Sequence, residues 1–271
     1  MAFSGTYYLL EKEGLLIHST LSLGLTSLRN ATLYTKDKYY SAFFELSIGM
    51  ERLMKTILIL SHMAHNELTP PSQAAMRKLG HDLESLFAKC KALEPSCGKT
   101  ALGQLAPDSM PLRILSFLSK FAKGDRYHNL DALTGATATD PLANWKDILE
   151  DILNDDVPAK QVQKINDQSS AVSSRIADIT FNITSDLDDS SLDIHQALAY
   201  PGLQELAARH AVWHVHVILL GLSDLLDCVT SEAMHESSKS GTATSDIPFM
   251  KEFLQFLGRA RADVLKKKRW P

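Results

Sequence analysis

Apolar residues recur at a helical period along nearly the whole chain. Spacings of three and four residues dominate, and the strict alternation typical of half-buried strands is hard to find. Pro71 and Pro141 stand where first helical turns are expected, a position that tolerates proline. The pattern predicts helices over residues 6–30, 36–65, 71–93, 109–123, 141–154, 158–186, 200–236 and 247–268. The expected fold class is therefore all-α.

Charge divides the chain unevenly, although its composition is ordinary for a globular protein of 271 residues. Residues 1–135 carry 15 Lys and Arg against 12 Asp and Glu, whereas residues 136–258 carry 7 against 19. The last thirteen residues hold six cations against one anion. The shift predicts a bundle over residues 1–135 and an additional helical region over 136–271, packed on it or forming a second lobe. Because the acidic middle repels phosphates, any nucleic-acid contact is expected from the first part or the tail.

The three cysteines predict free thiols rather than a structural framework. Cys90, Cys97 and Cys228 form no CxxC or Cys/His spacing, so neither a disulfide set nor a metal site is expected, and no cofactor is implied. The first residues lack a basic leader, and the apolar runs at 57–60 and 217–222 are far too short to span a bilayer. These features predict a cytoplasmic protein that is not inserted in a membrane.

The segment from residue 39 to residue 60 predicts a central helix with an ion pair. Glu51 and Lys55 are four residues apart, so they face one another on a helix. They belong to a largely apolar stripe of Tyr40, Phe44, Ile48, Glu51, Lys55 and Leu58. The opposite side is apolar as well, which predicts burial on most sides. The pair either fixes the register of the helix or forms the polar floor of a binding site.

Two further segments follow in a fixed order. Residues 80–86 begin Gly-His-Asp-Leu and place Leu83 and Leu86 one turn apart; taken alone, His81 and Asp82 predict a turn or a helix cap. Residues 125–131 read Asp-Arg-Tyr-His-Asn-Leu-Asp and, taken alone, predict a polar loop between helices. Residues 8–135 resemble the HEPN family, the higher-eukaryote and prokaryote nucleotide-binding domains. The resemblance rests on three groups of residues: Tyr40 with Glu51 and Lys55, then His81, then Arg126 with Tyr127. His128 stands where that family usually has proline.

The resemblance implies an antiparallel helical bundle that recognises RNA or a nucleotide. It points to Glu51, Lys55, His81, Arg126 and Tyr127 as ligand-binding residues. It also implies a bacterial stress or defence setting, with an antitoxin-like protein partner, and pairing of two copies into a homodimer.

A metal-independent ribonuclease is an alternative, because many HEPN proteins cleave RNA with an Arg and a nearby His. Arg209 precedes His214 and His216 at permitted spacings, and on a helix Arg209 and His216 share a face. The Arg would support the scissile phosphate and the His would serve as base or proton relay. The pair His210 and His214 does not predict a metal site, since a metalloprotease pattern would need Glu at position 211.

The basic tail has two interpretations of its own. Lys266, Lys267, Lys268 and Arg269 could contact phosphates while Trp270 stacks on a base. They could equally form a solvated helix end whose cations suit the helix dipole. A third function class also stays open, a non-catalytic interaction module whose acidic second half binds a basic partner.

Overall fold

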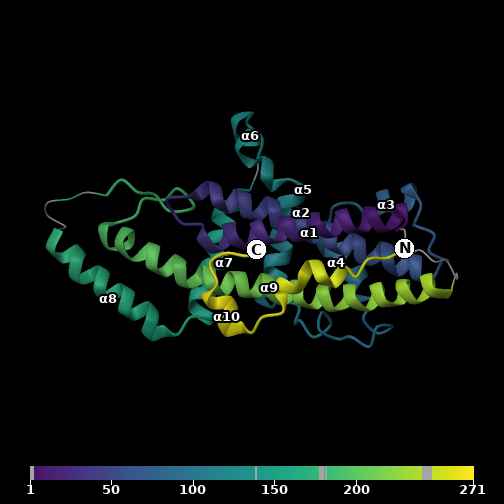
Figure 1. The fold of residues 1–271 in the computed structure, drawn as a ribbon. Coiled ribbons are helices and arrows are strands. Elements are labelled where there is room, and N and C mark those ends of the chain that lie inside the picture. The colour runs from purple at the N-terminus through teal and green to yellow at the C-terminus, as the bar shows by residue number, and fades with distance from the viewer. Residues whose placement is uncertain (1–2, 138, 177–179, 181, 240–245) are drawn as a thin grey trace.

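The computed structural model describes residues 3–271 apart from 138, 177–179, 181 and 240–245. Its regular elements are helices, and the described residues add one isolated antiparallel bridge, between Ser185 and Ser191. Figure 1 shows an elongated bundle in which the long helices α1, α2 and α9 run along the same direction. The all-α prediction is confirmed.

Helices α1 (Gly5–Asn30) and α2 (Lys36–Ala64) form a closely packed antiparallel hairpin. Ser4 begins α1 by accepting a hydrogen bond from the Tyr7 amide at 3.1 Å, as an N-cap does. Glycines let the two backbones approach, since Gly24 lies against Leu46 and Gly49 lies against Leu21. The face of α2 opposite the predicted stripe is fully buried, as expected, at Leu46, Met50, Leu53, Ile57 and Leu60.

A side chain at Gly49 should destabilise this hairpin. A Cβ there would lie 2.6 Å from Leu21 Cδ2 and 2.9 Å from Thr20 Oγ1, closer than real contacts. We expect Gly49→Ala to lower the free energy of unfolding by about 1–3 kcal/mol, measured by urea denaturation. Gly5→Ala is the control, because a Cβ at that helical position meets nothing within 4 Å and should change stability little. Equal stability of the two variants would contradict the close approach.

The long helix α9 (Ile194–Lys239) organises the second half of the chain. It packs against α1, α2, α5, α7 and α8. By length and composition it could cross a membrane, but 61% of its most apolar window is buried inside the fold. Most of that window therefore packs in the core of the fold. Core residues from both sides of residue 135, such as Phe43 and Trp145 with ring centroids 5.1 Å apart, belong to one hydrophobic cluster.

Shorter elements surround these three helices. Helices α4 and α5 pack on α2, while α8 lies along one end of α9 and α6 projects from the bundle (Figure 1). Their bounds are α3 (Gln73–Leu79), α4 (Leu83–Lys91), α5 (Met110–Lys123), η1 (Asp125–Tyr127), α6 (His128–Leu133), α7 (Pro141–Asp155), α8 (Ala159–Ile176), η2 (Met250–Leu257) and α10 (Arg261–Lys266).

Four predicted spans differ from the structure. The helix expected over 71–93 is broken at Gly80, whose φ of 66° a helix does not allow, and Asp82 caps a new helix by accepting from the Glu84 and Ser85 amides. The spans expected over 158–186 and 247–268 are shorter, the second being split at Gly258 into η2 and α10. Helix α9 begins at residue 194 rather than 200, with Pro201 in its first turns, and the expected loop at 125–131 folds into η1 and α6.

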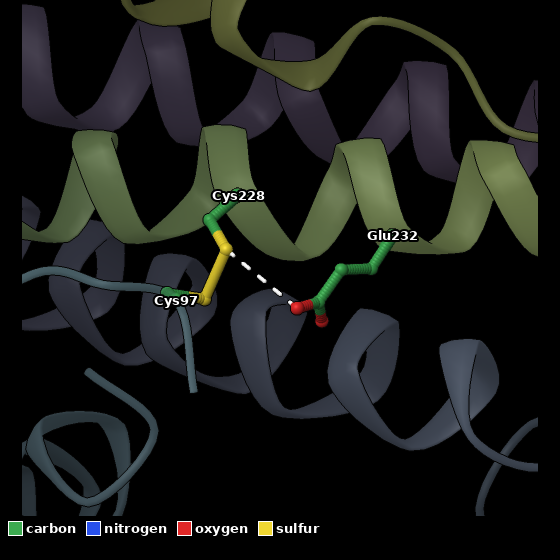
Figure 2. A group of neighbouring side chains, drawn as sticks. All are labelled: Cys97, Cys228 and Glu232. Atoms are coloured by element: carbon green, nitrogen blue, oxygen red, sulfur yellow. Dashed lines mark hydrogen bonds between the residues drawn. A yellow bond between two sulfur atoms is a disulfide. The ribbon is translucent and has the colours of Figure 1, made fainter. Parts of the chain in front are cut away.

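The expectation of free thiols was wrong for two of the three cysteines. Cys97, in the segment between α4 and α5, and Cys228, on α9, form a disulfide across 131 residues, with Cα atoms 5.9 Å apart (Figure 2). Cys90 alone among them is a free, buried thiol. No local spacing signals such a pair, because only the packing of the loop on α9 brings the two residues together.

Candidate functional site

A cavity of about 1010 Å³ opens beside α2 at the predicted stripe. Helices α1, α2 and α5 supply most of its wall, and the segment from Pro70 through α3 to Asp82, together with η1, completes it. Phe44, Ile48, Glu51 and Lys55 from the stripe all line it. The other lining residues are Thr6, Leu9, Leu10, Glu13, Ser47, Arg52, Thr56, Ile59, Met63, Pro70, Met76, His81, Asp82, Phe121, Ala122, Lys123 and Arg126.

Glu51 stands at the centre of the polar part of this cavity. Its Oε1 accepts a hydrogen bond from Lys55 Nζ at 2.7 Å, which confirms the ion pair predicted from the sequence. The same oxygen lies 2.9 Å from His81 Nδ1, which comes from the break between α3 and α4. The side chains of Glu51 and Lys55 are each 20% exposed, while that of His81 is 76% exposed. The pair is therefore half-buried and reachable from the cavity.

Two further ion pairs line the cavity. Arg52 Nη1 donates to both carboxylate oxygens of Glu13 at 2.6 and 2.7 Å, joining α2 to α1. Lys123 Nζ lies 2.7 Å from Asp82 Oδ2, and this hydrogen bond is the main reason that the pKa of Asp82 falls below its usual range. Asp82 also accepts from Ser119 Oγ, so it holds α4 and α5 together at the cavity wall.

Arg126 is the cation of this cavity that has no carboxylate partner among the described residues. Its guanidinium lies over the ring of Tyr127, 4.9 Å from the centroid, in a cation–π contact. Tyr127 itself is half-exposed and does not line the cavity. The structure thus brings four of the five residues implied by the family resemblance into one cavity. Tyr127 lies outside it and contacts Arg126.

Sequence reasoning missed several lining residues. Arg52 follows Glu51 directly, but nothing local shows that it reaches Glu13 on another helix. Lys123 and Phe121 lie at the end of α5, which reaches the cavity through the packing of α5 on α2. Phe44 was part of the predicted stripe, and its ring meets that of Phe121 at 5.0 Å edge to face.

The cavity can bind a ligand that has both a flat apolar part and an anionic part. Its formal charges are four cations, namely Arg52, Lys55, Lys123 and Arg126, against three anions, namely Glu13, Glu51 and Asp82. The apolar wall carries two phenylalanines, and the ring of Phe44 is 38% exposed.

The ribonuclease candidates do not converge on an open cleft. Arg209 Nη2 donates to Glu205 Oε1 at 2.9 Å, and this contact lowers the pKa of Glu205 to about 2. His214 Nε2 lies 2.7 Å from Asp156 Oδ2, with the His214 side chain 12% exposed. His216 has no exposed surface, and burial lowers its pKa to about 4. A buried, neutral His216 cannot reach a phosphate on RNA in this structure.

The basic tail is packed on the fold rather than extended. The Trp270 amide donates to Thr26 Oγ1 at 2.9 Å, and Asn30 Nδ2 donates to the Lys268 carbonyl at 2.7 Å. The Trp270 indole is buried in the core, so it is not free to stack on a base. Lys266, Lys268 and Arg269 remain exposed, and Lys268 Nζ lies 3.4 Å from Glu205. The Lys267 ammonium lies over the Trp270 ring at 5.9 Å, and burial lowers its pKa.

Comparison of the chain with protein-family models, with curated proteins and with solved structures finds no match in any of the three.

Proposed function

We propose that this is a HEPN-like protein that binds a nucleotide, or a nucleotide unit of RNA, in the cavity beside α2. The observation that carries the proposal is the convergence of Glu51, Lys55, His81 and Arg126 on one cavity, although they lie as far as 75 positions apart in the sequence. Local propensity does not require these residues to meet. The resemblance implied that they act together, and their placement supports it.

Phosphate recognition is supported by the cations of the cavity. Among the described residues Arg126 has no carboxylate partner to release before it binds an anion, whereas Lys55 is paired with Glu51 and Lys123 with Asp82. Guanidinium groups bind phosphate oxygens with paired donors, which favours Arg126 as the primary phosphate ligand. The exposed ring of Phe44 would stack on the base, and a volume near 1000 Å³ is ample for one nucleotide.

The proposed role is recognition without catalysis. A metal-independent cleavage would need an accessible base near a phosphate-binding Arg. His216 is buried, His214 is paired with Asp156, and Arg209 is held by Glu205. These contacts favour binding over cleavage as the function of this chain.

The biological setting belongs to the same proposal. A cytoplasmic protein that senses RNA or a nucleotide suits a bacterial stress or defence system of the toxin–antitoxin kind. An antitoxin-like protein would then be its partner, and a homodimer its working state.

Replacing Arg126 should weaken nucleotide binding. We expect Arg126→Ala to raise the Kd for a nucleoside triphosphate about tenfold or more, because it removes a charge-assisted hydrogen bond to phosphate. Titration calorimetry on the full chain at low and moderate salt measures this, and affinity should fall with salt. Lys120→Ala is the control, since Lys120 is an exposed cation on α5 outside the cavity.

Two results would overturn the proposal. If neither nucleoside triphosphates nor a short RNA bind at low salt, the interaction-module alternative is left. If Arg126→Ala and Lys120→Ala weaken binding equally, the ligand is attracted by overall charge and not by the cavity.

A further inference from the structure

A second group of reactive side chains lies on α9, apart from the cavity. Cys228 and Glu232 are one turn apart on that helix, and Cys97 faces them from the loop between α4 and α5 (Figure 2). The two sulfurs and one carboxylate oxygen all lie within 4.8 Å of one another. Cys228 Sγ and Glu232 Oε1 are 3.8 Å apart, and all three residues are partly exposed.

The loop holds Cys97 in place by contacts other than the disulfide. The carboxylate of Glu94, itself buried, accepts hydrogen bonds from the amides of Leu102 and Gly103, both at 2.7 Å. Leu102 is buried against Gly221, where a Cβ would lie 2.5 Å from its side chain. The loop is thus fixed on α9 two turns before Cys228, so the thiols should stay close together after the disulfide is reduced.

The reduced group has the composition of a metal site. Two thiolates and a carboxylate would repel one another, and Glu232 has no cationic partner within the described part of the chain. Thiolate and carboxylate are both zinc ligands, whereas calcium and magnesium take oxygen ligands. Ligand atoms in a tetrahedral zinc site lie roughly 3.5–3.8 Å apart, which matches the separation of Cys228 Sγ and the Glu232 carboxylate.

We propose that, in the reduced protein, Cys97, Cys228 and Glu232 bind a thiophilic divalent cation such as Zn²⁺, and that disulfide formation abolishes the site. Binding displaces two thiol protons, and water takes the fourth position. Oxidation by a small-molecule disulfide joins the two sulfurs, passes two electrons to that disulfide and yields two small thiols as it takes up two protons. The zinc ion then leaves as the hydrated cation. A protein in a reducing cytoplasm would hold the zinc form.

Zinc titration of the reduced and oxidised full chain tests this inference. Competition with a chromophoric chelator should show one equivalent of Zn²⁺ bound after reduction by a phosphine, and none in the disulfide form. Cys228→Ser should lose the site, and Glu232→Gln should weaken it about tenfold or more. Glu236→Gln is the matched control, since Glu236 is a partly exposed carboxylate one turn further along α9 that pairs with Lys239. With Co²⁺ in place of Zn²⁺, a thiolate-to-metal charge-transfer band should appear in wild type and be absent in Cys228→Ser.

Three outcomes would overturn it. Reduced wild type could bind no zinc, or Cys228→Ser could bind as much zinc as wild type. Equal zinc affinity of Glu232→Gln and Glu236→Gln would remove Glu232 from the ligand set. The melting temperature of each variant, measured with chelator present, separates loss of the site from loss of the fold.

Discussion

Reduction of the Cys97–Cys228 disulfide should lower the free energy of unfolding by about 2–5 kcal/mol. The bond joins residues 131 apart, so it removes a large loop-closure entropy from the unfolded chain. By the chain-entropy relation, a loop of that length gives roughly 5 kcal/mol, the upper end of the range. Urea denaturation of the oxidised and reduced protein, both with EDTA, measures the difference without a contribution from bound metal.

Cysteine variants distinguish the effect of the disulfide on stability from the effect of changing a cysteine side chain. Cys228→Ser in either redox state should unfold near the midpoint of reduced wild type, because it lacks the same constraint. Cys90→Ala keeps the disulfide, so its oxidised and reduced forms should differ in free energy of unfolding as much as those of wild type. Its truncated core side chain can lower both denaturation midpoints. Identical midpoints for oxidised and reduced wild type would mean that the two sulfurs are not joined in solution.

The helices that could be predicted from the sequence are those whose signals are local. The hairpin of α1 and α2 follows from uninterrupted apolar periodicity, and its observed ends differ from the expected ones by one residue. The predicted span 71–93 runs through the break at Gly80 because periodicity continues across it, although His81 and Asp82 alone predict a turn or a cap. The signal was nevertheless present, since a glycine followed two residues later by an aspartate is a helix stop and a new N-cap.

The contacts in the cavity also differ in whether local sequence could predict them. The contact between Glu51 and Lys55 is a consequence of helix geometry, so spacing alone was enough to predict it. The pairs between Arg52 and Glu13, and between Lys123 and Asp82, cross from one element to another and depend on how the helices pack. His81 entered the prediction only through the family resemblance, not through any local rule.

Burial is the property that periodicity left undetermined for the second half. Arg209 and His216 were correctly placed on one helix, but the apolar residues of that helix are not confined to one side, so periodicity shows no clear outer face. The packing of η2 and α9 encloses His216, whose ring stacks on Trp213 with centroids 5.6 Å apart. A spacing motif cannot distinguish such a core histidine from a catalytic one.

Mild acid should destabilise the protein through His216. Its pKa is about 4 in the folded state because burial disfavours the charged ring, against about 6.5 in an unfolded chain. Between those values the unfolded chain takes up a proton that the folded chain does not, so stability is complete above about pH 7 and falls as the pH drops. From pH 7.5 to pH 5.0 this single group should lower the free energy of unfolding by about 2 kcal/mol.

The variant His216→Leu isolates this contribution. It removes the titrating ring but keeps an apolar side chain in the core, so its loss of stability from pH 7.5 to pH 5.0 should be about 2 kcal/mol smaller than that of wild type. Urea denaturation at the two pH values measures the loss of stability of each protein. His235 is an exposed histidine on the same helix, so His235→Leu should lose as much stability as wild type. If His216→Leu lost as much stability as wild type from pH 7.5 to pH 5.0, the His216 ring would be hydrated in the folded protein. It would then be available as a base beside Arg209, and the argument against cleavage would lose its main support.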